Sequence, residues 1–189
     1  MLQPETLHFS VGEATTLRPV LADDAEGLFA LTHSNRAHLR RWLPWLDGTQ
    51  QTEDTRAYLN AAIEQARAGL GGVWAIEQSG ALCGVAGFNR IEPSNRTCEI
   101  GYWLSAEQQG KGIMTRCVER LIRHAFDDLS LNRITIPVAV ENQPSRAVAE
   151  RLGFRREGVL REAEWLYDHF VDHVLYALVR SEWRRPSDG

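Results

Sequence analysis

Apolar residues recur every three or four positions in two long stretches of the chain, which is the spacing of an amphipathic helix. The clearer stretch runs from Ile113 to Leu129. The other begins at Thr52, expected as its N-cap, and stops at Gly69. Two shorter helices are predicted, one after Asp23 or Asp24 and one from about Pro144 to Gly153.

Runs rich in β-branched and aromatic residues lie between these helices and predict strands. The predicted strands are Thr16 to Val20, Val73 to Glu77, Leu82 to Phe88, Thr97 to Leu104 and Ile134 to Val140, with a closing hairpin of Gly158 to Trp165 and His169 to Val179. Short turns between the second, third and fourth of them indicate an antiparallel meander. Pro137 interrupts the fifth, and a proline, which lacks an N–H, is expected at a sheet edge or bulge.

The order of these elements predicts an α/β (α+β) fold, with a mixed sheet and helices on both of its faces. No linker rich in Gly, Ser or Pro divides the chain, so residues 1–189 are expected to form a single domain with short tails outside about 15–183. The N-terminal stretch from Met1 to Val11 has no basic residue ahead of an apolar run, and we expect a cytoplasmic protein.

Composition excludes several classes of protein. Of the 189 residues 43% are hydrophobic and 24% charged, and no apolar run reaches the length of about 20 residues that a membrane helix needs. A net charge of −4 argues against nucleic-acid and anionic-membrane partners. Three cysteines without a Cys-x-x-Cys pair suggest reduced core thiols, and His169 and His173, four apart on a strand, match no metal motif. We expect no metal.

The loop from Gln109 to Thr115 carries the first chemical signal. Its Gly110-Lys111-Gly112 turn joins a predicted strand to the start of the long helix. Glycines there allow backbone N–H groups to converge on an anion, and the helix N-terminus adds partial positive charge. Phosphate binding is one interpretation, and an ordinary glycine-rich helix entry is the other.

Three blocks in a fixed order make the pattern more specific: Glu99 to Leu104, Gln109 to Thr115, and Asn142 to Phe154. Together they resemble the GCN5-related N-acetyltransferase (GNAT) superfamily. Trp42 to Trp45, Phe88 to Pro93 and Asp168 to Tyr176 further resemble its RimJ/RimL branch, which acetylates N-terminal residues of ribosomal proteins. The likeness covers about residues 15–183.

The resemblance implies a mostly antiparallel, twisted sheet in which two central strands, Thr97 to Leu104 and Arg133 to Val140, splay apart to admit acetyl-CoA. The residues that it assigns to acetyl-CoA are Tyr102, Trp103, Leu104, Gln109, Gly110, Lys111, Gly112, Ile113, Met114, Thr115 and Asn142. Asn142 could instead be only a helix cap. Met114 stands where the family usually has Gly or Ala, and its helical phase with Cys117 and Leu121 predicts that it points away from the anion.

The same resemblance assigns catalysis to Glu99 as general base and Ser145 as general acid. An α-amino group has a pKa of about 7.7 to 8.0 against about 10.4 for lysine, so a modest base suffices for a protein N-terminus. Glu99 could alternatively be a strand glutamate paired with an arginine, and Ser145 a residue that caps a helix. If Ser145 is structural, Tyr102 or Tyr167 would be the next candidate acid.

Trp42, Trp45 and Asn89 are expected to shape the acceptor groove, although large apolar loop residues are often core plugs. The resemblance implies a protein N-terminus as the acceptor. The family shares the donor half of its site and varies the acceptor half, so the donor motifs do not distinguish between acceptors. A small amine such as an aminoglycoside, a polyamine or an aminoacyl nucleotide is the second interpretation. A CoA-binding regulator without turnover is the third. The family's frequent dimers suggest a homodimer.

Overall fold

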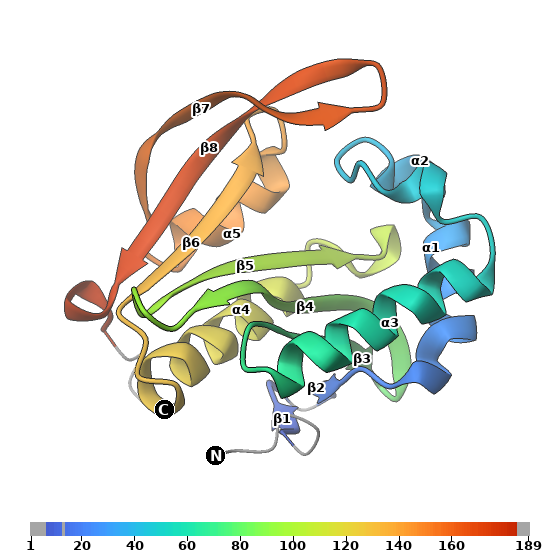
Figure 1. Cartoon of the computed structure of the whole chain (residues 1–189), viewed down its shortest axis with the longest axis horizontal. Helices are drawn as coiled ribbons and strands as arrows, with labels where there is room; N and C mark the ends of the chain where they lie inside the picture. Colours follow the sequence, from blue (N-terminus) through green and yellow to red (C-terminus); the bar gives the residue numbers. More distant parts are fainter. Residues whose placement is uncertain (1–6, 13, 185–189) are drawn as a thin grey trace.

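The computed structural model describes residues 7–12 and 14–184 and arranges them around one eight-stranded sheet (Figure 1). The strands are β1 (Phe9–Ser10), β2 (Thr15–Pro19), β3 (Gly72–Gln78), β4 (Ala81–Glu92), β5 (Thr97–Leu104), β6 (Arg133–Ala139), β7 (Arg155–Leu166) and β8 (His169–Val179). Their order across the sheet is β1-β2-β3-β4-β5-β6-β8-β7. The outer parts of the expected tails, residues 1–6 and 185–189, lie outside the described residues.

The α-helices are α1 (Ala25–Ser34), α2 (Arg36–Leu39), α3 (Thr52–Arg67), α4 (Ile113–Arg123) and α5 (Gln143–Arg151). Short 3₁₀ turns are η2 (Ala22–Asp24), η3 (Leu46–Gly48), η4 (Ala106–Gln108) and η6 (Arg180–Glu182), and η5 (His124–Asp128) is a π-helical turn. No helix within residues 7–12 and 14–184 is long and apolar enough to cross a membrane.

Side chains alternate between the two faces of the central strands and bury a separate cluster on each face. Trp74, Phe88 and Ile100 pack in the cluster that contains α4 and α5. Ala75 and Val85 pack in the cluster that contains α1 and α3. Figure 1 shows α3 in front of the sheet and α4 behind it. The prediction of a mostly antiparallel sheet with helices on both faces is therefore confirmed.

The parallel pair β5–β6 is held together over only part of its length. Thr97, Cys98 and Glu99 pair with β6, and the pairing ends at Glu99↔Thr135. Beyond that point β6 keeps its antiparallel partner β8, from Ile136 to Ala139, while β5 keeps β4 (Figure 1). Pro137 lies in the part of β6 that has left β5, where a missing N–H costs no ladder bond to that strand. The expected splay is confirmed.

Some details differ from the sequence prediction. The N-cap of α3 is Gln51 rather than Thr52, because the Asp54 carboxylate accepts the N–H groups of Gln50 and Gln51 at 2.9 and 3.0 Å. Strand β1 and helix α2 were not predicted, since two and four residues are too short to show a period. The long helix changes at His124 into the wider turn η5.

His124 occupies an unusual position for a titratable group. The residue is 2% exposed, and its ring packs against Phe9, Trp74 and Phe88 with ring centroids 5.5 to 6.1 Å apart. Its Nδ1 lies 2.8 Å from a carboxylate oxygen of Asp128. Burial lowers the pKa of His124 below 6.5, and the opposing pull of Asp128 does not reverse that direction.

This burial predicts a pH-dependent stability. Because the folded pKa of His124 lies below its unfolded value, the unfolded chain binds a proton at this site more readily, and the free energy of unfolding should fall as pH drops below about 6.5. Urea midpoints measured from pH 7.5 to 5.5 should fall less steeply in His124→Phe than in the wild type. Exposed His33 provides the control, since His33→Gln should keep the wild-type slope. An equal slope in His124→Phe would contradict the assignment.

Candidate active site

A cavity of about 520 Å³ opens where β5 and β6 diverge. Its walls come from the free part of β6 and the facing part of β5, from the start of α5, from α1 and α3, from the loop between α2 and α3, and from the β7–β8 hairpin. Eight of the residues predicted from the sequence line this cavity: Trp42, Trp45, Asn89, Glu99, Tyr102, Trp103, Asn142 and Ser145. Segments far apart in the sequence thus line one cavity.

The alternation of β5 sorts these groups onto two sides of the sheet. Cys98 and Ile100 pack toward α4, so Glu99 and Trp103 project toward α1 and α3. Tyr102 projects the other way and contacts α5 at Ser145. The carboxylate and the hydroxyl pair therefore approach the opening between β5 and β6 from opposite faces.

Ser145 and Tyr102 form a closed pair of hydrogen bonds. The Tyr102 hydroxyl donates to the Ser145 carbonyl at 3.0 Å and accepts from the Ser145 hydroxyl at 3.2 Å. Burial raises the pKa of Tyr102 to about 12, so the phenol stays protonated at neutral pH. Both hydroxyl groups reach the cavity with their protons in place.

The helix cap next to Ser145 is a different residue. Asn142 is the N-cap of α5, and its side-chain oxygen accepts the Ser145 N–H at 3.3 Å. Pro144 follows in the first turn, where a missing N–H is harmless. The interpretation of Asn142 as a cap is confirmed, whereas Ser145 as the capping side chain is wrong.

Glu99 has an amide rather than an arginine as its partner. The Asn89 amide nitrogen donates to Glu99 Oε1 at 3.1 Å. The alternative of a strand glutamate paired with an arginine is therefore wrong for the described residues. One carboxylate oxygen of Glu99 is held, and the group as a whole faces the cavity.

The tryptophans of the loop after α2 are walls of the cavity rather than core plugs. Trp42 and Trp45 both line it, and Trp45 is 40% exposed. The residue that anchors this loop in the interior is Leu46, which is fully buried. The guanidinium of Arg36 holds the same loop by donating to the carbonyls of Leu46 and Thr49, at 2.6 and 2.5 Å.

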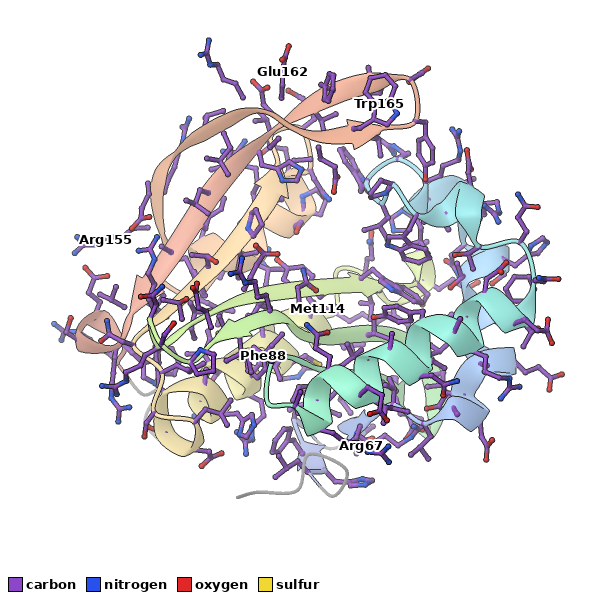
Figure 2. All side chains as sticks on the ribbon, in the orientation of Figure 1. Arg67, Phe88, Met114, Arg155, Glu162 and Trp165 are labelled. Atoms are coloured by element: carbon purple, nitrogen blue, oxygen red, sulfur yellow. The ribbon has the colours of Figure 1, made fainter. Side chains whose placement is uncertain are left out.

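The opposite wall contains two polar residues that the sequence did not assign to the site. His173 Nε2 lies 3.5 Å from Glu164 Oε2, and both side chains line the cavity. A bulge in β7 between Leu160 and Glu164 sets this position, and Asp172 fixes it by accepting the Glu162 N–H at 2.8 Å. Figure 2 shows Glu162 on the outer side of the hairpin. Nothing in the local sequence pattern signals such a bulge.

The two histidines of β8, four residues apart, have different surroundings. His169 is exposed and contacts its neighbour Asp168 at 2.6 Å, while His173 faces the cavity. In the part of the chain that the structure describes, no group of three or more His, Cys, Asp or Glu side chains is arranged to hold a metal. The hydroxyl of Tyr167, the other candidate acid, donates to the Leu43 carbonyl.

The loop between β5 and α4 has the backbone shape of an anion cradle. Gly110 and Gly112 have φ values of 74° and 72°, and Gly112 begins α4 without any side-chain cap. The side chain of Lys111 reaches back to Gln108 at 3.0 Å. The first N–H groups of α4 are thus left to bind a ligand or water.

Neighbouring side chains leave this loop open. Leu104, Ile113 and Met114 are buried in the core, so only their backbones face the loop, and the predicted orientation of Met114 is confirmed. The Gln109 amide donates to His38 at 2.9 Å, and the Thr115 hydroxyl accepts from Arg151 at 3.3 Å.

Comparison with known proteins identifies the family. The model of the acetyltransferase (GNAT) domain matches residues 15–155. The chain belongs to the GNAT family of acetyltransferases. The ribosomal-protein-serine acetyltransferase of Escherichia coli is 37% identical over 169 residues, which are 89% of this chain and 94% of that protein.

Two solved structures extend the comparison. RimL, a ribosomal α-N-protein acetyltransferase solved in complex with coenzyme A, superposes with a TM-score of 0.89 at 32% identity and covers 92% of this chain and 98% of its own. The microcin self-immunity acetyltransferase MccE, solved with acetyl-CoA and AMP, gives 0.85 at 31% identity, covering 89% and 94%. The similarity to both structures extends over most of this chain.

The features found in this acetyltransferase fit acetyl-CoA as the co-substrate. The unpaired edge of β5 beyond Glu99 offers backbone N–H and C=O groups to an extended amide chain, and the Gly110–Gly112 loop offers N–H groups to a pyrophosphate. Asn142, at the start of α5, lines the same cavity as this part of β5.

The positive φ of Gly110 yields a test of this placement. A Cβ at Gly110 would meet no atom within 4 Å, so Gly110→Val acts through backbone strain alone and should weaken acetyl-CoA binding by about tenfold or more in calorimetry. Gly153 has φ 79° and equally open space, so Gly153→Val is the matched control and should keep wild-type affinity. Equal affinities in both variants would contradict the placement.

Proposed function

We propose that this acetyltransferase transfers the acetyl group of acetyl-CoA to the N-terminal α-amine of a protein, with a ribosomal protein as the acceptor. The observation that carries the proposal is the convergence of Glu99 and the Ser145–Tyr102 pair on one cavity, from opposite faces of the sheet. The named activities of the E. coli relative and of RimL support the choice of acceptor.

Glu99 would act as the general base. The acceptor arrives mostly as an ammonium and must lose a proton before its nitrogen can attack the thioester carbonyl. Glu99 and Glu164 line the cavity, and none of the described lining residues is a lysine or arginine. Such a cavity favours a cation over an anion, and it suits an incoming ammonium.

Ser145 would act as the general acid. When the new C–N bond forms and the C–S bond breaks, the leaving thiolate needs a hydrogen bond and a proton. The Ser145 hydroxyl supplies both near the N-terminus of α5, where the helix dipole favours negative charge. Tyr102 holds that hydroxyl in the cavity, and among the described residues it is the other candidate acid that contacts Ser145.

A small-molecule amine is the second candidate acceptor. The similarity to MccE, solved with AMP, favours it, as do the aromatic walls formed by Trp42 and Trp45, which could stack on a planar group. A regulator without turnover is disfavoured, because both proposed catalytic side chains face the cavity. The expected cytoplasmic location and homodimer stay predictions.

The acceptor can be tested directly. Mass spectra of intact ribosomal proteins from wild-type and deletion cells should differ by one acetyl group on at least one protein, at its N-terminal residue. Purified enzyme with peptides of that N-terminus should then release CoA thiol from acetyl-CoA. An unshifted set of ribosomal proteins, together with thiol release on a small amine, would replace this acceptor by the second candidate.

The proposed role of Glu99 as general base predicts a loss of activity in Glu99→Gln. Glu99→Gln keeps the shape and the contact with Asn89 but cannot take a proton, so kcat/KM should fall by about 10² to 10⁴ at neutral pH. Activity should partly recover at higher pH, where more of the amine is already neutral. Acetyl-CoA affinity should stay the same. A wild-type pH profile in the variant would refute the assignment.

The acid role of Ser145 predicts a separation of catalysis from stability. Ser145→Ala should lower kcat strongly. Because Asn142 supplies the cap of α5, the shift in Tm should be smaller than the loss of a helix cap would cause, which costs about 1 kcal/mol of stability. Tyr102→Phe keeps the Ser145 hydroxyl and should lower kcat less. The opposite order of kcat losses would make Tyr102 the acid.

A further inference from the structure

A bulge in β4 places one residue beside the proposed base. Phe88 pairs with Ile100 and Arg90 pairs with Glu99, so Asn89 is an extra residue between two successive pairs. Bulges of this kind turn a side chain away from its regular direction and are frequent next to active sites. The side chain of Asn89 is directed along β5, toward Glu99.

The space that Asn89 occupies exists because the next residue on that face of β5 is a glycine. A Cβ at Gly101 would lie within 2.7 Å of three atoms, and all three belong to the Asn89 side chain. Glu99 and Gly101 are two apart and share a face. Asn89 therefore lies over Gly101 while its amide donates to Glu99 Oε1 at 3.1 Å. The amide orientation follows from charge, because the amide oxygen would repel the carboxylate.

Helix α3 fixes the bulge from the other side. The Gln65 amide donates to the carbonyl of Asn89 at 2.8 Å and to the carbonyl of Leu70 at 3.1 Å. Gln65 in turn packs against a second glycine, since a Cβ at Gly71 would lie within 2.9 Å of three of its side-chain atoms. The backbone of Asn89 is thus held by α3, and its amide is held by Gly101 and Glu99.

We propose that Asn89 is a positioning residue for Glu99 rather than a contact for the acceptor, and that Gly101 and Gln65 make this position possible. The inference rests on the proposed function, because it takes Glu99 as the group that accepts the proton. Asn89 holds Oε1 and restricts the rotation of the glutamate, which leaves Oε2 to the acceptor amine.

A double-mutant cycle tests the steric part of the proposal. Asn89→Ala should lower kcat/KM by about tenfold, the cost of one hydrogen bond to a charged group, with acetyl-CoA affinity unchanged. Gly101→Ala should cause a similar loss, because its methyl group displaces the amide. The double variant should be no worse than either single variant. Multiplied losses in the double variant would overturn the claim that Gly101 acts through Asn89.

The pH profile tests the electrostatic part, and it does not depend on the glycine variant folding. Asn89→Asp keeps the size of the side chain but faces Glu99 with a second negative charge. The acid limb of kcat/KM should therefore move to higher pH in Asn89→Asp, whereas Asn89→Ala adds no charge and should lower kcat/KM without moving the limb. An acid limb at the wild-type position in Asn89→Asp would overturn the proposal. Asn60→Ala on the exposed face of α3 and Gly158→Ala in β7, where a Cβ meets nothing, are the controls.

The Glu99→Gln variant, which lacks the proposed base, distinguishes a failure of this proposal from a failure of the proposed function. Adding Asn89→Ala to Glu99→Gln should cause no further loss of kcat/KM if Asn89 acts only through the carboxylate. A further loss with a raised acceptor KM would show that Asn89 contacts the acceptor, and only the positioning role would fail. Wild-type activity in Glu99→Gln alone would instead show that the proposed function of Glu99 has failed.

Discussion

The rest of the site depends on the point at which β5 and β6 stop pairing. Three residue pairs hold the two strands, and beyond Glu99↔Thr135 each keeps a partner only on its far side. A buried strand edge must find other hydrogen-bond partners, so a sheet opened in its centre is stable only where a ligand or water can supply them. The apolar cluster on the α4 and α5 face contains residues from both halves of the sheet and holds them in place without those bonds. The cavity, the base and the hydroxyl pair are all defined by this opening.

The parts of the fold predicted from sequence are those with a strong local period. The apolar stripe of α4 and the meander β3–β4–β5 could be predicted because each element makes its own pattern visible over seven or more residues. The bulges in β4 and β7 could not, since inserting an extra residue changes register without changing composition. Those bulges direct Asn89 and Glu164 into the site. Sequence therefore predicted where the strands lie better than which side chains they present.

The start of α5 shows how one contact decides between two interpretations. From sequence, Asn142 and Ser145 were both candidate caps, because either side chain can accept a backbone N–H at a helix start. In the structure Asn142 takes that role and Ser145 contacts Tyr102 instead. The choice depends on Tyr102, which is 43 residues away in the sequence and whose direction is set by the alternation of β5. No local pattern contains that information.

The two halves of the site differ in how far apart their parts lie along the chain. The Gly110–Gly112 loop and the start of α4 are continuous in sequence, so a short motif can identify them. The walls expected to receive the acceptor come from segments far apart in the sequence. The Tyr167 hydroxyl donates to the Leu43 carbonyl. The Arg40 guanidinium lies 3.8 Å from the centre of the Tyr167 ring and also pairs with Asp47. A change in either the loop after α2 or the β7–β8 turn alters this bridge while leaving the donor half intact. Relatives can therefore share acetyl-CoA binding and differ in acceptor, which is why the acceptor has to be identified by experiment.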